Sequence, residues 1–235
     1  MAATRLPGKP LLKINNLSII SHVFKRAEEA NIGEVVVATE DQVILEDVLK
    51  NGGKAVLTRG DHETGTDRIF EAYKKLDLKN VDYILNLQGD EPNINKDDII
   101  NLNNLMINCD SELGTLAAKI KDDKMLNNKN VVKVIVENKL EENNFPAALN
   151  FTRDNLSTDS QNIYHHIGIY SYKISVLEKF VSLDQTVDEK KNKLEQLRAL
   201  DNGLKINVAL AESSPIGVDT EEDYLAIKKI MEYKI

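Results

Sequence analysis

The sequence has one cysteine, no long apolar run and no excess of positive charge. A single thiol, Cys109, excludes both an intrachain disulfide framework and a zinc-finger pattern, since each needs several ligands or partners. No apolar run approaches the roughly 20 residues that span a membrane, and residues 1–5 are not followed by the apolar core of a secretory signal. We therefore expect a cytoplasmic protein without membrane insertion.

Basic residues are outnumbered: 30 Lys and Arg face 38 Asp and Glu, giving a formal net charge of -8 and a pI near 5.2. Non-specific nucleic-acid binding relies on a broad basic surface, so we expect no nucleic-acid partner. An anionic substrate would instead meet a local cluster of cations. Hydrophobic residues at 42% and charged residues at 29% are typical of a folded globular chain.

Strand-like and helix-like segments alternate along the first half of the chain. The run 34–39 is continuously apolar, as buried parallel strands are, and helical periodicity marks 18–29 and 65–76. This alternation predicts an α/β fold with a mostly parallel sheet covered by helices. The chain opens on a polar loop at 4–10, whereas a doubly wound domain opens on a buried strand. We therefore expect either that this strand lies upstream or that the fold begins without it.

After residue 112 the rhythm changes, because strand-like segments follow one another without an obligatory helix between them. This indicates a mixed or antiparallel insertion, a common place for a substrate lobe or a dimer surface. We expect a single domain over 1–235, with a core of 1–112 and 200–235 and an insertion of 113–199.

The polar loop at 4–10 contains two cations, Arg5 and Lys9, with Gly8 between them. Gly8 permits close backbone approach, an arginine binds phosphate oxygens as a fork and a lysine supplies a point charge. Such a loop could wrap a polyphosphate. A solvated basic terminus is the alternative, and composition alone favours it.

Two acidic motifs could hold a metal ion. Asp90 follows an apolar strand, and ligands of open α/β sheets bind beyond the carboxyl ends of the strands. A carboxylate there suits Mg²⁺, which binds few protein carboxylates together with substrate phosphates. Asp219 lies just before a helix that Thr220 is expected to cap, and it would complete the site beside Asp90. An ordinary acidic turn explains Asp90 equally well, and spacing does not show that the two aspartates meet.

A third candidate site lies on a strand that includes His166 and Tyr170. Alternate residues share a face, so these two side chains should point away from Ile167 and Ile169. A His and a Tyr around a Gly would form a recessed polar platform suited to a sugar. The alternative is a half-exposed strand with incidental histidines.

Six motifs in this order resemble the 3-deoxy-D-manno-octulosonate cytidylyltransferase family, the CMP-Kdo synthetases, over nearly the whole chain. They are residues 4–10, Arg59 with 64–68, 88–92, 166–170, 194–198 and 217–220. The resemblance implies a Rossmann-like three-layer fold of the nucleotide-diphospho-sugar transferase (GT-A-like) kind. It also implies a homodimer, whose insertion binds sugar and forms the dimer contact.

The resemblance further implies that CTP and 3-deoxy-D-manno-octulosonate (Kdo) give CMP-Kdo and diphosphate, activating Kdo for lipopolysaccharide biosynthesis with Mg²⁺ as cofactor. The implied roles are as follows: catalysis by Arg5, Lys9, Asp90 and Asp219; Mg²⁺ binding by Asp90 and Asp219; nucleotide binding by Thr4, Arg5, Lys9, Arg59, Thr64, Gly65 and Gln88; and sugar binding by Arg153, His166, Tyr170, Glu195 and Gln196.

Two alternatives remain. The acceptor could be another acidic sugar, 8-amino-Kdo or a sialic acid, or the chain could be a catalytically inactive nucleotide-binding relative. The segment 187–189 also departs from the family's Leu-Glu pair, which predicts that one acidic contact is shortened or shifted.

Overall fold

The computed structural model describes residues 6–156, 162–212 and 214–232. The chain forms two compact units. Unit 1 consists of Met1–Leu78, Leu87–Ile99 and Pro215–Ile235, and unit 2 consists of Lys79–Asn86 and Ile100–Ser214. No helix in the described part of the chain combines the length and the apolar character needed to cross a membrane.

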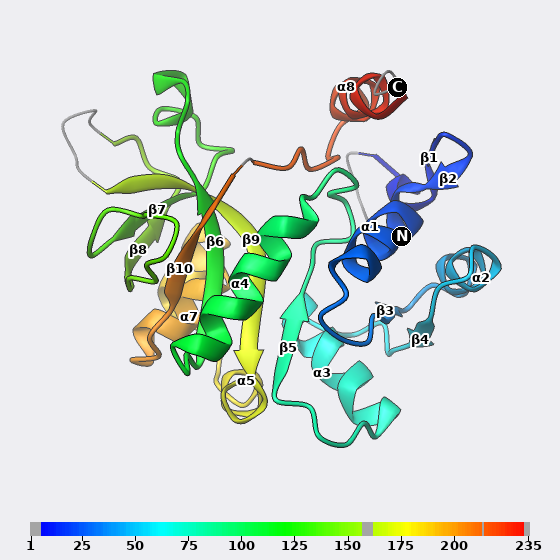
Figure 1. The fold of residues 1–235 in the computed structure, drawn as a ribbon, viewed down its shortest axis with the longest axis horizontal. Coiled ribbons are helices and arrows are strands. Elements are labelled where there is room, and N and C mark those ends of the chain that lie inside the picture. The colour runs from blue at the N-terminus through cyan, green and yellow to red at the C-terminus, as the bar shows by residue number, and fades with distance from the viewer. Residues whose placement is uncertain (1–5, 157–161, 213, 233–235) are drawn as a thin grey trace. The chain divides into compact units, whose positions relative to one another are not determined.

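Unit 1 is built from short strands and amphipathic helices (Figure 1). Its elements are η1 (Lys9–Leu11), β1 (Lys13–Ile14), β2 (Leu17–Ser18), α1 (Ile19–Ala30), β3 (Val37–Thr39), α2 (Gln42–Lys50), β4 (Ala55–Leu57), α3 (Gly65–Leu76) and α8 (Glu221–Glu232). β1 and β2 pair antiparallel, whereas β3 and β4 pair in parallel through the α2 crossover. The parallel pair and its helix confirm the alternation read from the sequence.

Helix α1 has clear sequence causes at both ends. Ser18 caps it by accepting a hydrogen bond from Ser21 N, and Asn31 ends it in the left-handed conformation at φ 50°. Its apolar stripe is buried: Ile19 joins one cluster with Ile14, Val218 and Ile227, while Ile20 and Phe24 join Ile44 and Val48 in another. The first cluster ties the N-terminal hairpin to α8, which matters for the site below.

Unit 2 contains one six-stranded sheet with its helices (Figure 1). Its elements are β5 (Tyr83–Asn86), most of α4 (Lys96–Asn108), β6 (Leu113–Ala118), η2 (Asp123–Met125), β7 (Lys133–Val136), β8 (Ala148–Thr152), β9 (Ile163–Lys173), α5 (Ile174–Val181), α6 (Val187–Asn192), α7 (Gln196–Asp201) and β10 (Asn207–Ala211). The strand order is β10-β6-β9-β7-β8, and β5 also pairs with β9. Residues just before β8 bridge to Asn207 of β10, so the two ends of the sheet meet.

The expected mixed pairing of the insertion is confirmed. β10 and β6 pair in parallel, and the other strand pairs of this sheet are antiparallel. Antiparallel pairing extends beyond 113–199, because β5 runs against the C-terminal half of β9. β5, most of α4 and β10 group with unit 2, whereas the sequence-based division placed the insertion at 113–199.

Gly114 on β6 is closely packed on the side where a Cβ would lie. A Cβ there would lie 2.5 Å from Met106 Sδ and 2.7 Å from Phe145 Cζ. We expect Gly114→Ala to lower the free energy of unfolding by about 1–3 kcal/mol, as overpacking of a full core does. Urea unfolding followed by circular dichroism measures this, with Gly33→Ala as the matched control because a Cβ at Gly33 meets nothing within 4 Å. Equal midpoints for the two variants would contradict the prediction.

Candidate functional site

A cation and two carboxylates from distant parts of the sequence meet in unit 1. Lys9 Nζ lies 2.6 Å from Asp90 Oδ2 and 3.1 Å from Asp219 Oδ1. Lys9 begins η1 directly after Gly8, whose φ of 72° is the left-handed conformation that glycine adopts without strain. The structure therefore brings together three of the residues predicted to bind triphosphate and metal.

Backbone contacts explain why the two aspartates meet. Val218 N donates a 2.9 Å hydrogen bond to the carbonyl of Asp90, and Ile216 N donates to Asn93 Oδ1. Val218 is fully buried. Asp219 follows it directly, so its carboxylate is carried to the turn that contains Asp90.

The start of α8 fixes the backbone of Asp219. Asp223 Oδ2 accepts hydrogen bonds from the backbone amides of Asp219 and Thr220, and Thr220 Oγ1 accepts one from Asp223 N. The expected capping role of Thr220 is confirmed. Because Asp223 is engaged in this cap, Asp219 is the acid of this motif that faces Lys9.

Electrostatics keep Lys9 charged. Burial lowers the pKa of its ammonium group, but attraction and hydrogen bonding to Asp90, with those to Asp219, outweigh burial and raise the pKa overall. Burial raises the pKa of neighbouring Glu91 to about 8, with the charge of Asp90 as a smaller cause. Glu91 is thus mainly protonated at neutral pH, which reduces the negative charge next to Asp90 in the sequence.

The donor set fits a hard divalent cation. No group of three or more His, Cys, Asp or Glu side chains suited to a metal occurs among the residues that the structure describes. Two carboxylates around one cation position match Mg²⁺, which binds protein through one or two carboxylates and takes its other ligands from substrate phosphates and water. A closed, all-protein metal centre is not what these residues build.

The loop after β4 is held by one carboxylate, that of Glu71 on α3. Glu71 accepts hydrogen bonds from Arg59 N at 3.1 Å and Arg59 Nε at 3.2 Å, and pairs with His62 Nε2 at 2.5 Å and Lys75 Nζ at 2.7 Å. The hydrogen bond from Lys75, followed by those from His62 and Arg59, lowers the pKa of Glu71 to about 2. The Arg59 side chain stays 69% exposed, so the anchored loop still presents its guanidinium to solvent.

No role was predicted for Glu71 from the sequence, although it lies on α3 one helical turn after Asp67, a residue of the 64–68 motif. Of the other predicted nucleotide residues, Thr64 caps α3 through Asp67 N, and Gly65 is the first residue of that helix. Gln88 is exposed beside the Asp90 turn. Thr4 and Arg5 lie outside the described residues.

A second group of predicted residues meets in unit 2. His166 Nε2 lies 3.1 Å from both Thr115 Oγ1 and the Tyr170 hydroxyl, and the Phe151 ring packs edge-on against it at 5.0 Å. Both His166 and Tyr170 are buried, as are Ile167 and Ile169 on the strand between them. β9 is therefore covered on both faces here, and the His–Tyr pair forms a buried network rather than an open platform.

Burial, with smaller contributions from His165 and Arg153, lowers the pKa of His166 to about 3. The unfolded chain thus binds a proton at this residue as the pH falls from 6.5 toward 3, whereas the folded chain does not. Folding stability from this residue is complete above pH 6.5 and is lost progressively below it.

We expect His166→Gln to flatten the dependence of the unfolding free energy on pH between 6.5 and 4.5. Urea titrations of wild type and variant at several pH values measure the two slopes. The raised pKa of Glu91 gives a slope of opposite sign above pH 4.5, so the difference between the two proteins isolates His166. Parallel slopes would show that His166 is not desolvated.

The motif at 194–198, which was predicted to bind sugar, contains one partner of a buried ion pair. Arg198 donates to both oxygens of Glu189, at 2.9 and 2.6 Å, and its guanidinium lies 4.7 Å from the Phe180 ring centre. Thr186 and Glu189 form a capping box at the start of α6. Within the segment 187–189, Glu189 is the acid that makes this two-pronged contact. That one acidic contact of the family is shortened or shifted here stays a prediction.

Two residues predicted to bind sugar, Glu195 and Gln196, lie at the start of the helix that contains Arg198. Gln196 begins α7 and is buried, and among the described residues its Nε2 has no hydrogen-bond partner. Glu195 is the residue just before the helix. Arg153 donates to the backbone carbonyls of Lys129 and Asn130, both at 3.3 Å.

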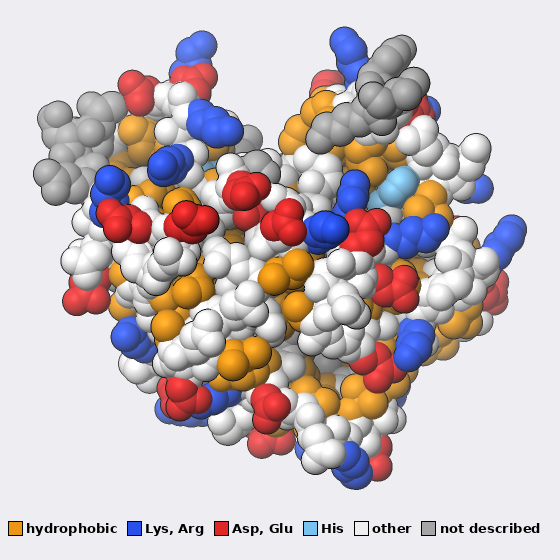
Figure 2. Space-filling view, in the orientation of Figure 1, with side chains coloured by type: hydrophobic (Ala, Val, Ile, Leu, Met, Phe, Trp, Pro, Cys, Tyr) orange, Lys and Arg blue, Asp and Glu red, His pale blue; other side chains and the backbone are white. Residues whose placement is uncertain are grey.

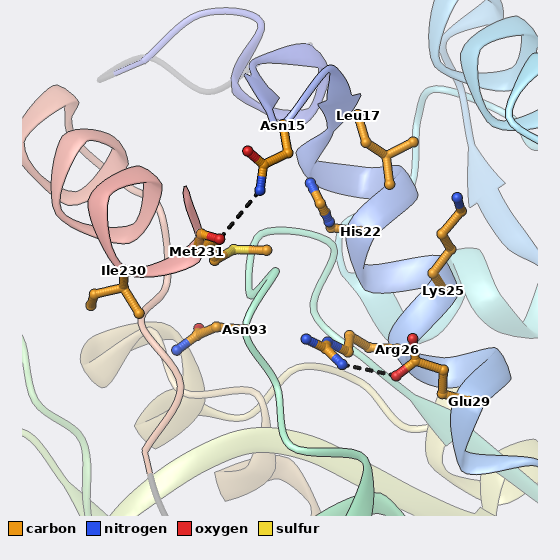
Figure 3. A pocket seen from close by; sticks show the side chains of 9 residues that line it. All are labelled: Asn15, Leu17, His22, Lys25, Arg26, Glu29, Asn93, Ile230 and Met231. Atoms are coloured by element: carbon orange, nitrogen blue, oxygen red, sulfur yellow. Dashed lines mark hydrogen bonds and ion pairs between the residues drawn. The ribbon is translucent and has the colours of Figure 1, made fainter. Parts of the chain in front are cut away.

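A pocket of about 330 Å³ lies in unit 1 between α1, the β1–β2 turn and the last turn of α8 (Figure 3). None of the predicted site residues lines it. Arg26 is paired there with Glu29 at 2.8 Å, and Asn15 Nδ2 donates to Met231 O. On the face drawn in Figure 2, cations are interspersed with acids rather than gathered in one broad patch.

Comparisons with known proteins connect these clusters to a family. The cytidylyltransferase family model matches residues 1–206. A relative from Rhodopseudomonas palustris (strain BisB18), named 3-deoxy-manno-octulosonate cytidylyltransferase, is 44% identical, covering 98% of this chain and 94% of its own length. The chain belongs to the 3-deoxy-manno-octulosonate cytidylyltransferase family. A Brucella ovis relative with the same name is 43% identical over 95% of this chain and 89% of its own.

The fold of this family member is similar to those of solved nucleotidyltransferase structures. A CMP:2-keto-3-deoxy-manno-octonic acid synthetase complexed with CTP matches with a TM-score of 0.89 and 34% identity, covering 99% of this chain and 95% of that one. An apo UDP-glucose pyrophosphorylase matches with a TM-score of 0.70 at 12% identity, a likeness of fold alone. The predicted Rossmann-like nucleotidyltransferase fold is confirmed.

Proposed function

We propose that this chain is a Mg²⁺-dependent enzyme that converts CTP and Kdo to CMP-Kdo and diphosphate. The observation that carries the proposal is the meeting of Lys9 with Asp90 and Asp219 in a member of this family. Asp90 and Asp219 would hold the metal ion. A bound Mg²⁺ would supply charge stabilisation at the phosphates and lower the pKa of a nearby hydroxyl.

The reaction makes one bond and breaks one. The anomeric hydroxyl oxygen of the sugar acid attacks the α-phosphorus of CTP and loses its proton, and diphosphate leaves. Lys9 and Arg5 would hold the triphosphate and stabilise the departing diphosphate by their charge. Positioning and electrostatics therefore carry the catalysis.

Cytidine would lie at the loop of Arg59, with Thr4, Thr64, Gly65 and Gln88. The exposed Arg59 guanidinium and the amide of Gly65, in the first turn of α3, are its available donors. The Thr64 hydroxyl already serves the helix cap, so its contribution would be to orient that turn.

Glu71 is expected to matter for nucleotide binding without touching the nucleotide. Glu71→Gln loses the charge that holds Arg59, His62 and Lys75 together, so the loop becomes less ordered. We expect the KM for CTP to rise by up to about tenfold, as for the loss of a charged hydrogen-bond centre, with kcat little changed. Steady-state kinetics measure this, and Glu46→Gln is a control because Glu46 lies on α2, where it accepts a hydrogen bond from Gln42 of the same helix. A fall in kcat at unchanged KM would contradict it.

The sugar acid would be recognised by unit 2 residues. The unpartnered amide of buried Gln196 offers a donor to a hydroxyl or carboxylate of a polyhydroxylated acid. Glu195, His166, Tyr170 and Arg153 would complete the set, with His166 neutral because of its lowered pKa. A neutral imidazole and a tyrosine hydroxyl suit sugar hydroxyls.

Family membership also supports a cytoplasmic homodimer whose contact includes strands between 113 and 173, and a product used in lipopolysaccharide biosynthesis. Light scattering after gel filtration measures whether the chain is a homodimer.

Diphosphate release from CTP and Mg²⁺, with Kdo, 8-amino-Kdo and a sialic acid offered separately, tests the proposal. Release with Kdo at the highest kcat/KM is the expected result. Preference for another acid would change the acceptor and keep the reaction. No release with any acid would favour an inactive nucleotide-binding relative.

A further inference from the structure

The position of Lys9 has a consequence for how the metal ion reaches its site. One ammonium group contacts both proposed metal ligands, at 2.6 and 3.1 Å. The exposed fraction of the Lys9 side chain is only 15%, compared with 27% for Asp90 and 51% for Asp219. Lys9 is therefore the least exposed of the three side chains, and its ammonium group bridges the two carboxylates.

The carboxylate pair needs a counter-ion. Two like charges held together repel each other, and partial burial increases the cost because water screens them less. Lys9 neutralises one of the two charges, and its attachment to η1 directly before Pro10 keeps it in place. The aspartates are thus already compensated before any ligand arrives.

Lys9 and a metal ion compete for the same oxygens. Mg²⁺ takes carboxylate oxygens as ligands at about 2.0–2.1 Å and demands octahedral geometry. Lys9 Nζ already contacts one oxygen of each aspartate, so an ion that uses these two oxygens has to displace the ammonium group. A free ion entering alone must break both ion pairs and leave Lys9 partly buried without a partner. An ion that arrives bound to a triphosphate brings phosphate oxygens, which give Lys9 new partners.

We propose that Lys9 is an exchangeable internal counter-ion, which closes the aspartate pair to free divalent cations and moves to phosphate oxygens when a metal–nucleoside triphosphate chelate binds. This inference rests on the proposed function for the identity of the chelate. Within one catalytic cycle, Lys9 would contact first the aspartate pair and then phosphate oxygens. The metal ion would enter the site bound to the nucleoside triphosphate.

The test is binding of Mn²⁺ alone, followed by electron paramagnetic resonance, with no nucleotide present. We expect Lys9→Met to bind Mn²⁺ at least about tenfold more tightly than wild type, because two ion pairs no longer have to be broken. Lys13→Met, which removes an exposed lysine of the adjacent strand β1, should bind Mn²⁺ as wild type does. Lys9→Gln serves as a second variant should Lys9→Met fail to fold by circular dichroism.

The α,β-methylene analogue of CTP supplies the second arm. Wild type should bind Mn²⁺ tightly when the analogue is present, and Lys9→Met should lose affinity for the Mn²⁺–analogue chelate while it gains affinity for the bare ion. These opposite changes in affinity indicate exchange, because replacement of a purely structural lysine would lower the affinity for both the bare ion and the chelate.

The outcomes separate the inference from the proposed function. Equal affinity of wild type and folded Lys9→Met for bare Mn²⁺ overturns the counter-ion role alone. Absence of any Mn²⁺ binding by folded Lys9→Met, with or without the analogue, overturns the aspartate pair as a metal site and with it the proposed function.

Discussion

Asp90→Asn is expected to lower turnover at least about 100-fold while the fold is retained. The amide has the size of the carboxylate but no charge, so it removes the attraction for a divalent ion and the 2.6 Å ion pair with Lys9. The backbone carbonyl of residue 90 still accepts from Val218 N, so the turn should keep its place. Initial rates of diphosphate release measure turnover, and circular dichroism reports the fold.

The matched control is Glu222→Gln, which neutralises an exposed acid in the first turn of α8. It changes the net charge by the same amount at an exposed position, whereas the described partners of the Lys9 ammonium group are Asp90 and Asp219. Its turnover should therefore equal that of wild type. Turnover of Asp90→Asn equal to that of Glu222→Gln would eliminate the metal role of Asp90.

The sequence was sufficient to place Asp90 at the end of a strand and Asp219 before a helix, because apolar runs and capping residues are local signals. It was not sufficient to show that they meet. That depends on the backbone hydrogen bond between residues 218 and 90 and on the packing of Val218 with Ile14 and Ile19, which are contacts over long sequence distances.

The buried state of His166 shows the same limit in unit 2. Strand alternation correctly separated His166 from Ile167, but it could not show that the second face is covered as well. A register shift at Thr115–Leu116 in the β6–β9 pair lets the Thr115 hydroxyl reach both His166 and the carbonyl groups of Ile167 and Ile169. Nothing local to residues 166–170 encodes that shift.

Glu71 and Glu189 were missed for a related reason. Each is an acid on a helix, where the ordinary expectation is a solvated carboxylate. Their roles arise because cations at other positions, Arg59 and Arg198, are brought back to them by the fold. The Leu-Glu-Gln-Leu-Arg motif contained Arg198, but its sequence alone did not reveal the partner.

Arg198→Met is expected to lower the free energy of unfolding by about 3–5 kcal/mol, because it leaves the Glu189 carboxylate buried without its partner. The side chains of Arg198 and Glu189 are 3% and 5% exposed, so water cannot compensate for the loss. For a chain of this length, the melting temperature should fall by about 10 °C. Thermal and urea unfolding measure the change.

A surface pair provides the control for Arg198→Met. Arg26 and Glu29 are 44% and 48% exposed at a similar distance, so Arg26→Met should cost less than about 1 kcal/mol. The double variant Glu189→Leu/Arg198→Met removes both buried charges and should recover much of the lost stability. Equal losses in Arg198→Met and Arg26→Met would show that the Glu189–Arg198 pair is not desolvated.

The same variants separate stability from recognition. Arg198 follows Gln196 by two residues on α7, and its contact with Glu189 ties this turn to α6. In the double variant, which restores stability without restoring that tie, we expect the KM for Kdo to stay raised and the KM for CTP to match wild type. A double variant with wild-type values for both substrates would show that the ion pair stabilises unit 2 without orienting Gln196.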